Sequence, residues 1–189
     1  MGHRWFRLGD RGRYSAQTRI QMSPREYHYV GPPEIGETAR NQPSGTPILS
    51  LEDISKWLAT GPTEQLPDGN WIATFTVSTN HVLHLAPRRS EHVACASGGP
   101  VLSAGEITID EDFRVPEISN QSTGFCPEPK SWKSVEFALN QIGIQHPGEF
   151  TTSVVFRRCP KCHERNIVKD SWYQCQICDA ELPLSLIHI

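Results

Sequence analysis

Two closely spaced cysteine pairs near the end of the chain constrain its fold more than any other feature. Cys159 and Cys162 form one C-x2-C pair, and Cys175 and Cys178 form a second pair after a gap of twelve residues. Two residues between cysteines let both sulfurs of one tight turn face a single ion, and four thiolates make a closed tetrahedral zinc site. We therefore predict one structural Zn²⁺ held by these four cysteines.

The twelve residues between the pairs are enough for one strand out and one strand back. The segments NIVKD and SWYQC are the expected strands, and they would bring the second turn beside the first in a zinc-ribbon hairpin over residues 157–183. Because the site has no open position, we expect the metal to be structural and not catalytic. His163 is a conceivable substitute ligand, but four thiolates make a surface position the better interpretation.

Three other uses of four cysteines are weaker. Two disulfides would need an oxidising compartment, and nothing in the sequence targets one. A redox C-x-x-C would need a thioredoxin-like βαβ context, which the sequence lacks. An iron–sulfur cluster also takes four cysteines, but two tight pairs across a hairpin favour zinc.

Length and charge set broad limits on the function. The chain has 189 residues, 18 basic and 21 acidic, and a formal net charge of −3. This balance provides no global field that would attract nucleic acid or an anionic membrane. No run of about 20 apolar residues is present, so we expect no membrane-spanning helix and a cytoplasmic protein.

Both ends of the sequence are set aside from the fold prediction. Residues 1–26 are interpreted as a disordered arm or an upstream extension, with Met22 as a possible true start. The last six residues, LSLIHI, resemble a translated sequencing adapter, so residues 184–189 are interpreted as an artefact tail.

The remaining pattern predicts an α+β domain over residues 27–156: a small, mostly antiparallel sheet with one or two packed helices, followed by the ribbon. Apolar spacing predicts helices at 50–61 and 131–143, with Ser50 and Ser131 as caps. Residues 31–50, rich in Pro and Gly, are expected to form a loop. The expected strands cover residues 71–78, 81–87, 101–110, 113–119 and 150–157.

The ribbon itself carries little net charge. Between Arg157 and Glu181 the sequence has five basic and four acidic residues, and a zinc ion with four thiolates adds about two negative charges. Phosphate binding requires a marked positive excess. We therefore expect no nucleic-acid binding through the ribbon, although Trp172 and Tyr173 have rings that could stack on a base.

A run of small residues precedes and enters the strand expected at 101–110. Ser97, Gly98 and Gly99 leave little side-chain volume, so a backbone, an aromatic ring or a ligand can approach closely. The ordinary interpretation is a turn with close packing behind it. The alternative is a ligand pocket whose floor is the GGPVLSAGE segment, with Glu106 as a buried carboxylate.

A second polar run, SNQSTGFCPEP, follows about one strand later. Asn120, Gln121 and Ser122 are adjacent hydrogen-bonding side chains. Such a run usually caps its own turn, but it can also present donors to a ligand.

Together, ASGGPVLSAGEITI, ISNQSTGFCPEP and the cysteine ribbon resemble an uncharacterised bacterial family with GGPVLAAGE-like and SNQSTGYCPEP-like motifs. The resemblance spans roughly Trp71 to Pro183. A looser version occurs in other bacterial proteins and in plant IQ-motif calmodulin-binding proteins, with His and Tyr in the loop where this chain has Phe125 and Cys126. The resemblance implies one compact fold and brings no established chemistry.

The sequence therefore favours a zinc-stabilised binding or interaction module whose partner is an unknown protein or small molecule. The alternative is a small enzyme acting on a nucleotide-like or small polar substrate, with His92 and Glu106 as catalytic candidates. Cys95 and Cys126 are further candidates, because a nucleophilic Cys with a His base is a known arrangement, but a lone Cys is usually a small buried apolar residue. No phosphate loop, Rossmann glycine pattern or catalytic triad signature is present, which favours the binding module.

Overall fold

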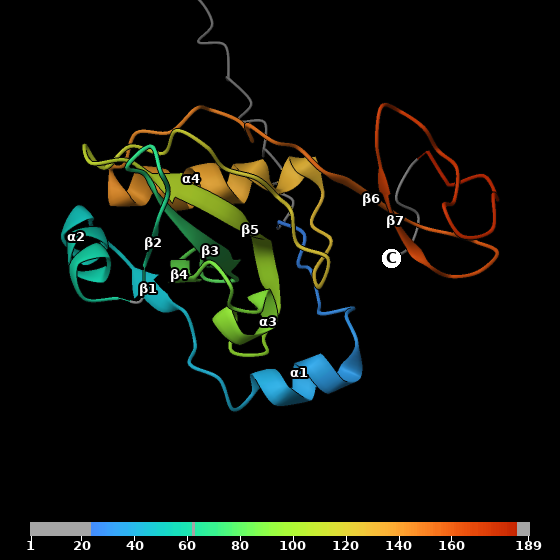
Figure 1. Ribbon diagram of the computed structural model, residues 1–189, viewed down its shortest axis with the longest axis horizontal. Coiled ribbons are helices and arrows are strands. Elements are labelled where there is room, and N and C mark those ends of the chain that lie inside the picture. Colours follow the sequence, from blue (N-terminus) through green and yellow to red (C-terminus); the bar gives the residue numbers. More distant parts are fainter. Residues whose placement is uncertain (1–23, 62, 185–189) are drawn as a thin grey trace, which may run out of the picture.

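A five-stranded antiparallel sheet with helices on both faces forms the body of the molecule, and a separate two-stranded ribbon follows it (Figure 1). The computed structural model describes residues 24–61 and 63–184. The predicted α+β fold with a C-terminal cysteine cluster is confirmed. The predictions for residues 1–23 and 185–189 lie outside the described residues. No helix in the described ranges is long and apolar enough to cross a membrane.

Strand β3 (Trp71–Ser78) is the centre of the sheet and is almost entirely buried. Its β-branched and aromatic residues suit a strand covered on both faces. Strand β5 (Val101–Ile109) pairs along its whole length on one edge, while β4 (Leu83–Pro87) and β2 (Glu64–Gln65) share the other. Strand β1 (Thr46–Ile48) extends the sheet beyond β4.

Helices α2 (Leu51–Thr60) and α4 (Trp132–Ile142) cover one face and bury their apolar stripes in the larger core. Ser50 caps α2 as predicted, because its hydroxyl accepts a 3.2 Å hydrogen bond from the Asp53 amide. Gly143 ends α4 with φ of 80°, a conformation that favours glycine. Both predicted helices are confirmed.

The opposite face is covered by two short helices, α1 (Pro33–Ala39) and α3 (His92–Cys95), which lie on the other side of the sheet from α4 in Figure 1. They form a second apolar cluster with Tyr27, Ala104 and Phe125. The sheet is therefore the middle layer of three.

The expected loop at 31–50 is wrong at two places, because α1 and β1 lie within it. Pro33 occupies the first turn of α1, where a missing amide costs nothing and the fixed φ suits a helix. Pro47 is tolerated in β1 because that strand lies at the edge of the sheet.

Two further predictions need correction. The segment 113–119 forms only isolated bridges, Arg114 to Gln145, Ile118 to Ile107 and Ser119 to Thr152, so it is not a strand. Pro116 lies between them and cannot donate to a ladder. Ser131 does not cap α4 with its side chain; its hydroxyl is 2.9 Å from that of Ser103, and a 3-10 turn, η1 (Pro129–Ser131), leads into the helix.

The small residues of β5 allow another backbone segment to pass close to the strand. A Cβ atom added to Gly105 would lie 1.9 Å from the Ser119 carbonyl oxygen, so the 118–120 segment passes directly over β5 at this residue. The Ser119 amide donates to the Glu106 carbonyl at 2.9 Å. Ser97 and Gly98 lie in the turn after α3 with positive φ, which matches the ordinary interpretation of this run.

We predict that Gly105→Ala destabilises the domain by about 3 kcal/mol, because the new methyl group overlaps the Ser119 backbone. The matched control is Gly99→Ala, whose Cβ meets its nearest neighbour, the Ala96 oxygen, at 3.4 Å and should cost less than about 1 kcal/mol. Urea unfolding measures both. Equal stability of the two variants would show that the strand does not require glycine at position 105.

Candidate metal centre

The cysteine pairs lie in a ribbon whose strands differ from those predicted. Strand β6 (Val155–Arg158) pairs antiparallel with β7 (Arg165–Val168), and the first cysteine pair lies in their connection. The expected pairing of NIVKD with SWYQC is wrong. The partner of NIV is the strand that leaves the main domain, and the second cysteine pair closes its own small hairpin through a bridge from Gln174 to Glu181.

The two cysteine turns share one hydrogen-bond pattern. In the first, the Cys159 amide donates to the Glu164 carbonyl at 2.8 Å, and the His163 amide donates to the Cys159 carbonyl at 3.0 Å. In the second turn the equivalent bonds, Cys175 to Ala180 and Asp179 to Cys175, are 2.8 and 3.0 Å. The residue after each second cysteine has positive φ, 64° at His163 and 57° at Asp179. The two cysteine pairs therefore lie in turns of the same conformation.

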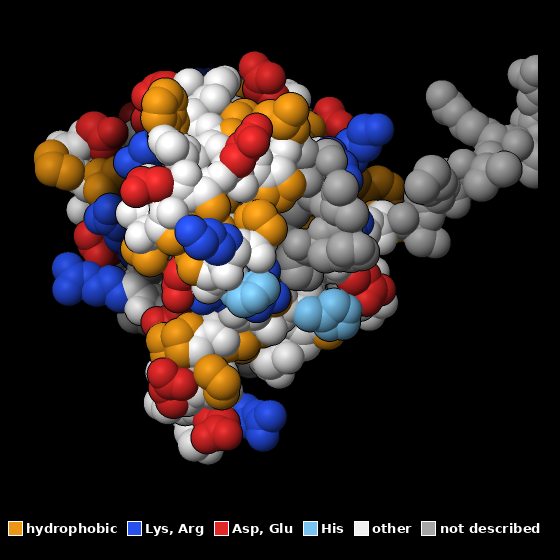
Figure 2. Space-filling model, turned by 90° about the vertical axis from the view of Figure 1, so that its right-hand side faces the viewer, with side chains coloured by type: hydrophobic (Ala, Val, Ile, Leu, Met, Phe, Trp, Pro, Cys, Tyr) orange, Lys and Arg blue, Asp and Glu red, His pale blue; other side chains and the backbone are white. Residues whose placement is uncertain are grey.

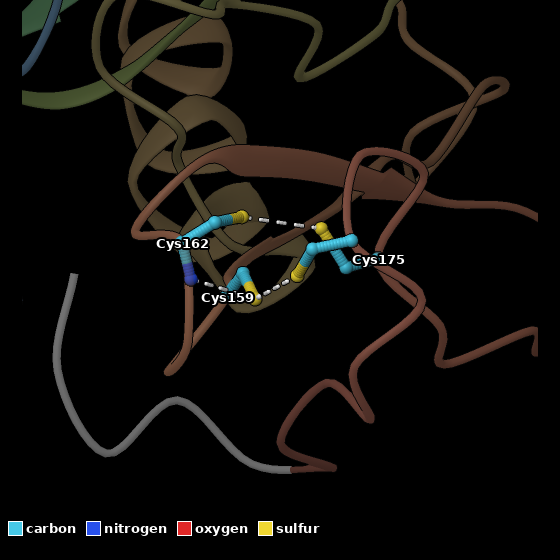
Figure 3. Close-up of side chains that lie close together, drawn as sticks. Cys159, Cys162 and Cys175 are labelled. Atoms are coloured by element: carbon cyan, nitrogen blue, oxygen red, sulfur yellow. Dashed lines mark hydrogen bonds between the residues drawn. The ribbon is translucent and has the colours of Figure 1, made fainter.

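The four sulfurs converge on one point (Figure 3). All four Sγ atoms lie within 4.8 Å of one another, and the Cys159–Cys178 and Cys162–Cys175 sulfur pairs are each 3.5 Å apart. A tetrahedron with metal–sulfur bonds of about 2.3 Å has sulfur–sulfur edges of about 3.8 Å. A disulfide would need about 2.05 Å, and none of the described cysteines forms one. These four residues could hold one metal ion.

Amide groups favour the thiolate form at two of the four sulfurs, those of Cys159 and Cys175, whereas desolvation and the neighbouring thiols raise the pKa of Cys162 to about 12. The backbone amides of Cys162 and Lys161 point at the Cys159 sulfur at 3.5 and 3.4 Å and lower the pKa of that thiol. Desolvation raises the pKa of Cys175, but amide donors, including Ile177 at 3.4 Å, bring it down to about 6. Such donors orient and stabilise metal-bound thiolates, so the surroundings fit a metal centre as well as the sulfurs do.

Asn166 ties the two halves of the ribbon together, and the sequence analysis did not identify it. Its side-chain nitrogen lies 3.6 Å from the Cys175 sulfur and donates to the Glu164 carbonyl at 3.0 Å. Its side-chain oxygen accepts from the Gln176 amide at 3.0 Å. Asn166 is buried, and a buried amide must find partners, but the sequence carries no signal of this burial.

Arg157 anchors the C-terminal segment and was also missed as a functional side chain. It is buried, and its guanidinium donates to the carbonyls of Phe156, Pro183 and Leu184 at 2.7–3.0 Å. The strand expected at 150–157 is shorter than predicted, because β6 begins at Val155.

Among the candidate ligand-binding residues, Asn120 is fully buried and has its side chain engaged by the backbone. Its nitrogen donates to the carbonyls of Pro127 and Val154, both at 2.8 Å, and its oxygen accepts from the Val154 amide at 2.7 Å. Gln121 is exposed beside it. Ser122 is buried, and its hydroxyl has no partner among the described residues.

The other candidates lie at the opposite side of the sheet from α4. Ser97 and Gly98 are exposed, and Gly99 is half-buried. The Nε2 atom of His92 lies 3.1 Å from the Gly105 carbonyl, and burial lowers the pKa of this imidazole.

Glu106 is not a buried carboxylate, because its side chain is 40% exposed. Its nearest described ion partner is Arg88, whose Nε atom lies 3.9 Å from the Glu106 carboxylate. The His92 imidazole contacts the carbonyl of Gly105, the residue before Glu106, while the Glu106 carboxylate faces Arg88. Their catalytic role stays a prediction.

Comparison of the chain with protein-family models, curated proteins and solved structures found no match in any of the three. The resemblance based on GGPVLSAGE and SNQSTGFCPEP therefore stays a prediction, and the site rests on its own geometry.

We predict that Cys175→Ser lowers the affinity for Zn²⁺ at least about a hundredfold, since it removes one of four ligands and the acceptor of two N–H···S contacts. Competition with a chromophoric chelator measures the affinity. The matched control is Cys95→Ala, a buried cysteine outside the cluster, which should keep full metal affinity. Equal loss in both variants would mean that the cluster is not the metal site.

Proposed function

We propose that the protein is a zinc-stabilised binding module in which a structural Zn²⁺ on Cys159, Cys162, Cys175 and Cys178 fixes a ribbon that presents a surface to a partner. The observation that carries this proposal is the convergence of four sulfurs within 4.8 Å, which would complete a tetrahedron and leave no ligand position open. A catalytic zinc keeps such a position for water or substrate.

Zinc is the metal we favour because the donor set consists of thiolates alone in two matching turns. Soft thiolates select zinc, copper(I) and iron–sulfur clusters, and a tetrahedral set of four sulfurs fits zinc or iron. Sulfur separations of 3.5 Å match the edges of a tetrahedron around a single small ion.

The surface around the ribbon supports a partner other than nucleic acid. Figure 2 shows the end of the molecule that carries the ribbon, and its visible Lys and Arg side chains are interspersed with Asp, Glu and hydrophobic ones. Phosphate recognition would require one sign of charge to dominate.

Cobalt substitution tests whether the site is closed. The Co²⁺-loaded protein should show the visible absorption of a tetrahedral thiolate complex, and added azide should leave this spectrum unchanged because no position is free. An azide-dependent spectral change, together with turnover of a small molecule, would contradict the proposal. A Co²⁺ form of Cys178→Ser, which has three thiolates left, is the control in which azide should bind.

A further inference from the structure

The outer side of the second cysteine hairpin carries a groove that the metal site does not use. It has a volume of about 360 Å³ and is lined by Trp172, Tyr173, Gln174, Asp179 and Glu181. The Trp172 side chain is 67% exposed, which is unusual for so large an apolar residue on a small ribbon. The indole is therefore available to a partner.

Two backbone contacts connect the walls of the groove. Its two walls are joined by the Gln174–Glu181 bridge and by the Leu182 amide, which donates to the Tyr173 carbonyl at 2.9 Å. The turn between the walls contains Cys175 and Cys178. A bound metal would therefore fix the wall positions, and a pre-formed site loses little entropy on binding.

The charges in the groove are negative and lack an ion partner. Neither Asp179 nor Glu181 forms a salt bridge with any other described residue, and both are exposed. Arg157 lies beside one wall of the groove, with its guanidinium 5.9 Å from the Tyr173 ring centre, but this group is engaged by three backbone carbonyls. Two carboxylates beside an exposed indole are complementary to an incoming cation.

We propose, resting on the binding module of the preceding section, that this groove binds a peptide segment through an arginine side chain. The guanidinium would stack on Trp172 while its N–H groups pair with Asp179 and Glu181. Arginine fits better than lysine, because its planar group both stacks on aromatic rings and pairs with carboxylates in a fixed fork. A metal bound by four thiolates would add negative charge behind the groove and strengthen the attraction.

The test uses the full-length, zinc-loaded protein and a fluorescein-labelled, end-capped nonapeptide of alternating Gly and Arg. Fluorescence anisotropy at 50 mM salt should show saturable binding that weakens at 300 mM salt. The same peptide with citrulline in place of Arg keeps the shape without the charge and should not bind. A twelve-nucleotide oligo-dT should neither bind nor compete.

Variants locate the binding site. Trp172→Ala should weaken peptide binding at least about fivefold, and Asp179→Asn with Glu181→Gln should do the same. Asn tolerates the positive φ of residue 179, so the turn is preserved in the second variant. The matched control, Glu34→Gln with Glu37→Gln on α1, removes two exposed negative charges elsewhere and should change affinity less than about twofold.

Zinc content, measured on each sample, separates the two proposals. If wild-type protein carries one zinc per chain yet binds no Arg peptide, the groove inference is wrong and the zinc-stabilised module stands. Equal weakening by the α1 control, equal binding of the citrulline peptide, or binding of oligo-dT in place of the peptide would also overturn the inference. If the purified protein cannot hold zinc, both proposals fall.

Discussion

Four cysteine sulfurs within 4.8 Å of one another are the constraint on which the ribbon depends. As thiolates they would repel one another strongly in a partly buried site, and a divalent cation between them converts this repulsion into attraction. Apart from the cysteines, the apolar core of the ribbon is small. Leu182 is its one other buried side chain among the described residues, and Val168, Tyr173 and Ala180 pack partly buried against it. Because this apolar core is so small for about thirty residues, we expect the ribbon to depend on a bound metal for much of its stability.

The ribbon is not independent of the sheet domain, because two features join them. Val154 is bound on both its amide and its carbonyl by the Asn120 side chain, just before β6 begins. Phe156 on β6 packs with Cys126 and Ile167 in a small cluster between the two parts. Asn120 therefore fixes the chain at the point where it leaves the sheet domain and enters the ribbon. Its role is structural, although it lies in a polar loop.

The sequence predicted those parts of the fold whose cause is local. Ser50 and Gly143 lie at the ends of α2 and α4, where they mark the start of one helix and the end of the other. The β-branched and aromatic residues of β3 predict a strand by themselves, without knowledge of its pairing partners. The cysteine spacing, likewise, predicted the cluster. The ribbon pairing failed because it depends on β6, which is set by contacts of Val154 and Phe156 with residues thirty positions earlier.

Long-range packing also explains the remaining differences. Gly105 appeared only as one of several small residues, yet the passage of Ser119 over β5 depends on it. Asn166 and Arg157 carry no motif, because their roles follow from where the Cys175 sulfur and the Pro183 and Leu184 carbonyls come to lie. A single sequence shows the residue types, but it does not show which residues distant along the chain come into contact.

X-ray absorption at the zinc edge would show whether the four cysteine sulfurs bind one ion. For zinc-loaded protein we expect a single shell of four sulfur atoms at about 2.3 Å, with no nitrogen or oxygen ligand. A shell containing fewer sulfurs and a light-atom ligand, or the absence of bound zinc after purification in a reducing buffer, would contradict it.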